Sequence, residues 1–99
     1  MSRLIDIGLE QLSRLIYKMG DLSEKTVSLS FDCYLKGIDS YEKVQVWSET
    51  LVSLSEEAED KAVELIARYQ PVASNLRKIK SYMKMAYDLN VTQQIHRNI

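Results

Sequence analysis

The side chains that could take part in chemistry gather near the C-terminus, in the stretch DLNVTQQIH that begins at Asp88. Asn90 and Gln94 in this stretch are four residues apart, which places two side chains on the same face of a helix. Hard cations in proteins prefer anionic oxygen ligands, and neutral amides supply no charge. The pair therefore favours a hydrogen-bonded contact across a helical interface over a metal site.

The rest of the chain offers no catalytic constellation. The sole histidine, His96, falls in the last turn of an expected helix, where a cation interacts favourably with the helix dipole. Ser, His and Asp residues occur without a nucleophile elbow, a glycine-rich phosphate loop, or HExxH or CxxC spacing. The single cysteine, Cys33, cannot form an intrachain disulfide, and we expect it to be a small buried apolar group. The sequence predicts neither an enzyme nor a bound cofactor.

Charge is balanced overall and uneven locally. The 13 Lys and Arg residues and 14 Asp and Glu residues leave a net charge of −1, so no global field indicates direct binding to nucleic acid. A basic strip is expected from Arg77, Lys80 and Lys84 on one side of a helix, with Arg68 nearby. An acidic face is expected from Glu56, Glu57, Glu59, Asp60 and Glu64. The strip is either a solvated surface or a binding surface for an acidic partner or a phosphate group.

No apolar run approaches the roughly 20 residues that cross a bilayer, which predicts no membrane insertion. Charged residues occur early, at Arg3, Asp6 and Glu10, where a signal peptide would be apolar. We therefore expect a cytoplasmic protein.

The elements that must position these residues are three long helices. The 99 residues contain three Gly and one Pro, and apolar residues recur every three or four positions. We predict one domain, residues 1–99, with helices at about 2–37, 40–69 and 71–97. Short joints make successive helices antiparallel, so the fold class is all-α, an up-down-up three-helix bundle.

Two joints separate the helices. Gly37 is suited to the left-handed conformation that ends a helix, and Asp39 with Glu42 is typical of a capping box. Pro71 is expected at the first helical position of the third helix, with Gln70 just outside it.

The third helix should turn one apolar face inward, formed by Val72, Leu76, Ile79, Met83 and Ala86, while Trp47 and Tyr69 of the second helix should lie in the core. Other apolar residues lie off the main seams, so some of them must meet a partner chain or stay exposed. These are Leu4, Leu15, Phe31, Tyr34, Val46, Val52, Val63, Tyr82 and Tyr87.

The segment QPVASNLR, together with the helical pattern around it, resembles one three-helix repeat of the PhoU family of phosphate-uptake regulators. The family's third helix opens with Gln-Pro-x-Ala-x-Asp/Asn-Leu-Arg. The matching positions in this chain are Gln70, Pro71, Ala73, Asn75, Leu76 and Arg77. The resemblance implies a PhoU-like bundle over nearly the whole chain.

The resemblance also implies a metal position, from which this chain departs. PhoU-like proteins continue the helix as Leu-Glu-Arg-Ile-Gly-Asp, whose two acids bind clustered metals in some members. Those acids correspond here to Asn90 and Gln94, and a second family set aligns with Ser48, Val52 and Ser55. We therefore expect no metal at these positions, although a metal-dependent protein using acids such as Asp88 or Glu49 stays open as an alternative.

By resemblance, the function is a non-enzymatic regulatory module for phosphate transport, which contacts the transporter's ATPase or a sensor protein. Because the family repeat usually occurs twice in one chain, a single repeat should form a homodimer. The alternative is a structural or dimerisation module of a larger transport or transcription-regulating protein.

Overall fold

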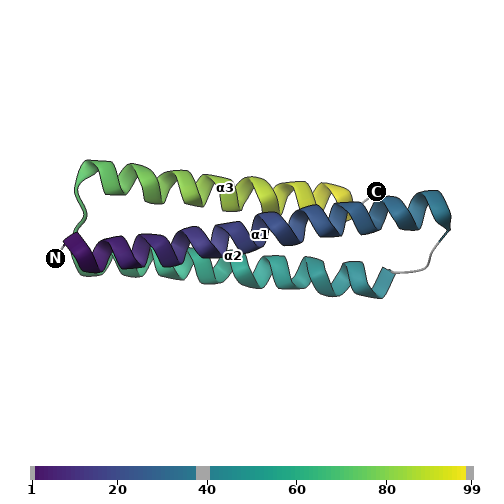
Figure 1. The fold of residues 1–99 in the computed structure, drawn as a ribbon, viewed down its shortest axis with the longest axis horizontal. Coiled ribbons are helices and arrows are strands. Elements are labelled where there is room, and N and C mark those ends of the chain that lie inside the picture. The colour runs from purple at the N-terminus through teal and green to yellow at the C-terminus, as the bar shows by residue number, and fades with distance from the viewer. Residues whose placement is uncertain (1, 38–40, 98–99) are drawn as a thin grey trace.

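The computed structural model describes residues 2–37 and 41–97, and the side chains of 3–37 and 41–92. It contains the helices α1 (Ser2–Lys36), α2 (Tyr41–Tyr69) and α3 (Ala73–Arg97), and no strand among the residues it describes. The helices run up, down and up in a rod of 53 × 17 × 15 Å, with α1 between the other two in the view of Figure 1. The predicted all-α three-helix bundle is confirmed.

A continuous apolar seam holds the three helices together. Its members are Ile5, Leu9, Leu12, Ile16, Met19, Leu51, Ala58, Ala62, Leu65, Ile79 and Ala86. Their spacing of three and four along each helix follows the helical repeat, as the sequence predicted. Small residues bring α1 and α2 close: a Cβ at Gly8 would collide with the side chain of Leu65, which is almost fully buried.

The first joint ends α1 as expected. Gly37 has a φ of 65°, the left-handed conformation that closes a helix and that only glycine adopts without a steric cost. Glu42 lies in the first turn of α2, where an acid interacts favourably with the helix N-terminus. The predicted cap residue Asp39 lies outside the described residues.

The second joint differs from the prediction that Pro71 opens the third helix. Gln70 has a φ of 43°, and its N–H donates to the carbonyl of Ile66 at 3.2 Å, which closes α2 with a left-handed cap. The helical bonds of α3 start two residues later than predicted, where Leu76 N–H donates to the Val72 carbonyl at 3.0 Å. Two non-helical residues, Pro71 and Val72, are needed to reverse the chain after this cap.

Several predicted core positions are less buried than expected. Val72 and Leu76 are exposed because α3 begins beyond the joint, where neither α1 nor α2 covers that flank. Trp47 is half-buried, and the Lys43 ammonium lies 5.0 Å from the centre of its ring. Cys33 is also half-buried.

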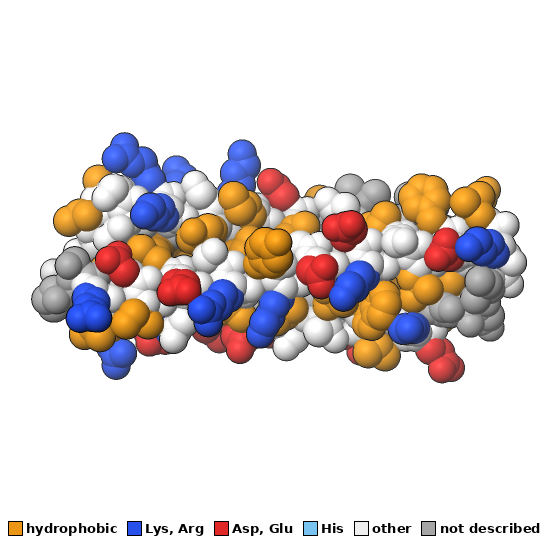
Figure 2. Space-filling view, in the orientation of Figure 1, with side chains coloured by type: hydrophobic (Ala, Val, Ile, Leu, Met, Phe, Trp, Pro, Cys, Tyr) orange, Lys and Arg blue, Asp and Glu red, His pale blue; other side chains and the backbone are white. Residues whose placement is uncertain are grey.

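The off-seam apolar residues divide into two groups. Leu15 and Tyr82 pack against the core. The others remain exposed, and Phe31 and Tyr34 form part of an apolar surface on the last turns of α1, which extend beyond α3 (Figures 1 and 2). None of the described helices has a stretch long and apolar enough to cross a membrane.

Candidate functional site

The core changes character along its length, and it is polar at Ser48, Ser55 and Asn90, three of the positions that align with the family metal set. Ser23 and Thr26 of α1 and Ser48 and Ser55 of α2 are buried, and Asn90 of α3 is half-buried. We call these five residues the polar layer. Because α1 and α2 are antiparallel, the C-terminal half of α1 lies beside the N-terminal half of α2 (Figure 1), so Ser23, Thr26 and Ser48 share one half of the bundle.

Hydroxyl groups in the polar layer are satisfied unequally. Thr26 Oγ1 donates to the Leu22 carbonyl at 2.7 Å, and the neighbouring Ser30 Oγ donates to the Thr26 carbonyl at 2.9 Å. Ser48 is 3% exposed, and its Oγ has no hydrogen-bond partner among the described residues. A buried hydroxyl without a partner costs stability, so Ser48 is an energetic weak point of the layer.

The donor set of the polar layer does not fit a metal ion. Its described side chains are neutral hydroxyls and one amide, which cannot offset the desolvation of a multivalent cation. Val52, which aligns with a family acid, is 40% exposed and does not belong to the layer. The side chain of Gln94 lies outside the described residues, as does that of His96. No three His, Cys, Asp or Glu side chains within the described part of the chain could hold a metal ion together.

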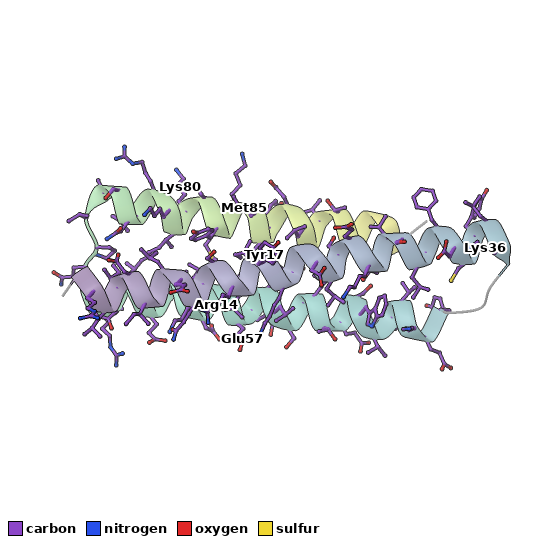
Figure 3. The ribbon with its side chains drawn as sticks, viewed as in Figure 1. Arg14, Tyr17, Lys36, Glu57, Lys80 and Met85 are labelled. Carbon is purple, nitrogen blue, oxygen red and sulfur yellow. The ribbon has the colours of Figure 1, made fainter. Side chains whose placement is uncertain are left out.

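The basic strip lies on the outer side of α3. Arg77, Lys80 and Lys84 are exposed and occupy the side of the helix opposite the buried Ile79 and Ala86. Basic side chains project along the edge of α3 in Figure 2, and Lys80 is labelled on this helix in Figure 3. None of the three takes part in an ion pair with a described residue, so their charges are available to a partner.

Arg68 is placed differently from the other three basic residues. It lies at the end of α2, and its Nη1 atom is 3.6 Å from Oε1 of Glu64. This pair is exposed and contributes little stability. Arg68 and Arg77 both lie within two turns of the α2–α3 joint, at the same end of the rod.

Two surface grooves flank α1. The first, between α1 and α2, is lined by residues of both charges, including Arg14, Lys18, Glu57 and Asp60, and Figure 3 shows Arg14 and Glu57 on its two sides. The charges are mixed, so this groove has no selectivity for an ion of one sign.

The second groove, between α1 and α3, was missed in the sequence. It is lined by Tyr17, Tyr82 and Met85 and by the acids Asp21, Glu24 and Asp88. Tyr17 and Met85 lie between the two helices in Figure 3. The sequence does place Tyr17 next to the buried Ile16 and Met85 next to the buried Ala86. A residue beside a core position lies at the edge of a helix interface.

Comparison with known proteins identifies the family of the chain. The model of the PhoU domain matches residues 16–91. The chain belongs to the PhoU family. PhoU is a regulatory family of phosphate homeostasis. Neither a curated protein nor a solved structure matches the chain.

The residues that match the PhoU domain include the segment QPVASNLR, on which the resemblance was based. Gln70 and Pro71 form the α2–α3 joint, Asn75 is half-buried in the first turns of α3, and Ala73 and Arg77 are exposed. The motif therefore sets the reversal between two helices. The polar layer and the basic strip also lie within the matched residues, whereas Gln94 lies beyond them.

Proposed function

We propose that this chain is a single PhoU-like unit that regulates phosphate transport by protein contact and performs no chemistry of its own. The observation that carries the proposal is the family match, joined to a row of exposed cations on α3 without ion-pair partners among the described residues. The site residues support contact over catalysis, because the described polar layer is made of neutral groups. We place its action in the cytoplasm, at the transporter's ATPase subunit or an associated sensor.

Arg68 and Arg77 are the residues that we assign to this contact. Both are exposed near the joint, and a guanidinium group binds carboxylates through two parallel hydrogen bonds. An acidic surface on the ATPase subunit therefore fits this end of the rod. Lys80 and Lys84 extend the same positive field along α3 and raise the rate of encounter.

The test is binding of the purified chain to the phosphate transporter's ATPase subunit, measured by biolayer interferometry. The double variant Arg68→Glu with Arg77→Glu should bind at least about tenfold more weakly, because two attractive contacts become repulsive. The matched control is Arg3→Glu with Lys18→Glu, which makes the same charge change on α1 and should bind normally. Equal binding by both double variants rejects this assignment of residues.

We also propose that the chain forms a homodimer, because its exposed apolar residues exceed what three helices cover among themselves. This supports the second candidate function, a structural module that assembles a larger transport or transcription-regulating protein. A dimer that does not bind the ATPase subunit would favour that candidate over regulation of the transporter.

A further inference from the structure

The groove between α1 and α3 takes no part in the contact proposed for Arg68 and Arg77. It has a volume of about 650 Å³ and is open to solvent. Its lining residues on α1 run from Ser13 to Glu24, which is about three helical turns, or roughly 16 Å along the helix. A ligand that fills this groove is therefore elongated.

The charges that line this groove are all negative. Asp21, Glu24 and Asp88 line it, and none of the described side chains that line it is basic. Glu24 and Asp88 form no ion pair with a described residue, and Asp21 pairs with Lys25, 3.1 Å away, which does not line the groove. The groove between α1 and α2 is lined by both charges, so it lacks this selectivity. The occupant of the α1–α3 groove therefore carries positive charge.

The rest of the lining is largely apolar. Tyr17 is 81% exposed and Met85 is 49% exposed, and both lie between the two helices (Figure 3). Tyr82 and Leu89 are half-buried and connect this lining to the core. Aromatic and methionine side chains gain energy when apolar groups cover them, and the face of a tyrosine ring also attracts cations. The occupant therefore combines apolar groups with its positive charge.

Gly20 deepens the groove and has no packing role within the chain. It lines the groove, and a Cβ at this position would meet nothing within 4 Å. Gly8, by contrast, is needed for the close contact with Leu65. A glycine inside a helix costs about 1 kcal/mol relative to alanine, and in the isolated chain nothing offsets this cost at Gly20. The space left by its missing side chain can receive an apolar group of a ligand.

We propose that this groove binds a basic amphipathic helix of a partner protein. The helices α1 and α3 both run upward in the rod, so they border the groove as two parallel ridges (Figure 1). A helix laid between two such ridges packs as the fourth helix of a bundle. Its apolar face covers Tyr17 and Met85, and its charged flank meets the acids.

The lining residues also give the bound helix a direction. Residue numbers increase the same way along α1 and α3, so Tyr17 and Tyr82 lie toward the α2–α3 joint and Glu24 and Asp88 lie toward the other end. The partner helix therefore places an apolar side chain at Gly20 and lysine or arginine side chains beside Glu24 and Asp88.

A small cation fits this groove less well than a helix does. Sites for small molecules enclose most of the ligand surface, whereas this groove is open to solvent. A helix contacts both walls over the full length of the lining. The contact is independent of the one proposed for the ATPase subunit, which uses Arg68 and Arg77, so each proposal can fail without the other.

The probe for this groove is the peptide LKKLLKLLKKLLKL, labelled with fluorescein at its N-terminus. As a helix it has leucines on one face and lysines on the other. Fluorescence anisotropy should show binding to the parent chain. The peptide LEELLELLEELLEL has the same apolar face with the opposite charge, and it should bind at least about tenfold more weakly.

Charge reversal tests whether the peptide binds at the groove. The variant Glu24→Lys with Asp88→Lys should raise the Kd of the basic peptide at least about tenfold, because two attractions become repulsions. The matched control is Glu56→Lys with Glu59→Lys, which makes the same charge change on α2. At 0.15 M salt, this control should raise the Kd no more than about threefold, because salt screens charges outside the groove. Circular dichroism should show equal helix content in both variants.

Filling the hollow at Gly20 tests the apolar part of the contact without changing any charge. Gly20→Leu should raise the Kd at least about fivefold, the effect of losing one or two buried methylene groups from the contact. Its thermal midpoint should not fall below that of the parent, because leucine favours a helix more than glycine does. The matched control is Gly20→Ala, which adds a single methyl group and should bind like the parent.

Three results would overturn the proposal. The first is equal binding of the two peptides, and the second is binding of the basic peptide that neither Glu24→Lys with Asp88→Lys nor Gly20→Leu weakens. The third concerns spermine, a small linear polycation, which should not displace the peptide at equal molar concentration. Displacement by spermine would mean that the groove takes a small cation and not a partner helix.

Discussion

The surroundings of Ser48 in the structure differ from those that its alignment with a metal-binding acid suggests. In the sequence it aligns with an acid of the family metal set, and in the structure it is buried in the polar layer without a hydrogen-bond partner. The desolvation of its Oγ is therefore not compensated by a bond. The polar layer retains a cost to stability without gaining the charge that would hold a cation.

We predict that Ser48→Ala stabilises the protein. Removing the unpaired hydroxyl should raise the free energy of unfolding by about 1 kcal/mol beyond the gain in helix propensity. The control is Ser53→Ala, the same substitution at an exposed position of α2, which reports the propensity gain alone. Urea denaturation followed by circular dichroism measures both variants, and equal effects would contradict the prediction.

At the scale of the helices, the two glycines inside α1 have opposite surroundings. Neither interrupts α1, which agrees with the single helix predicted at about 2–37. Gly8 lies against the buried Leu65, which leaves no space for a Cβ, whereas a Cβ at Gly20 would meet nothing within 4 Å. The first glycine permits a close approach of two helices, and the second only weakens α1.

Alanine substitution at these glycines should therefore give opposite results. Gly20→Ala should raise the free energy of unfolding by about 1 kcal/mol, the difference between the two residues in a helix interior. Gly8→Ala gains the same propensity but overpacks the contact with Leu65, at a cost of about 1 to 3 kcal/mol. Thermal unfolding should place the midpoint of Gly20→Ala above the parent and that of Gly8→Ala below Gly20→Ala. Equal midpoints for the two variants would mean that α1 and α2 do not meet closely at Gly8.

At the scale of the molecule, the net charge is near zero, but some acids of α2 and lysines of α3 form no ion pair with a described residue. The chain has a net charge of −1, yet most ion pairs of the described residues lie within α1 and on the α1-facing flank of α2. Long-range attraction to nucleic acid is therefore weak, while the unpaired charges on α2 and α3 can still act at short range.

We predict that the folded protein does not depend on a metal ion. A chelator such as EDTA should leave the thermal midpoint unchanged. A metal ion bound only by the folded state would raise the midpoint, and its removal would then lower it. Elemental analysis of the purified protein should find less than one transition metal ion per ten chains. Iron or zinc at a stoichiometric level would contradict the prediction and would point to acids such as Asp88 or Glu49.

The sequence by itself determined the three helices, their approximate ends and the family. A repeat of three and four residues predicts a helix from local geometry alone, and Gly37 and the QPVASNLR segment mark the joints. It did not determine the start of α3, because Gln70 takes the left-handed conformation and moves the first helical bond beyond Pro71.

Only the tertiary structure decided which flank of each helix is covered. Val72 and Leu76 follow the inner repeat of α3 yet are exposed, whereas Tyr82 lies off that repeat and packs on the core. Periodicity fixes which residues share a side of one helix, but the burial of that side depends on where the other two helices lie. The same reason kept the burial of the unpaired Ser48 hydroxyl out of reach of the sequence, since it depends on the heights at which antiparallel helices meet.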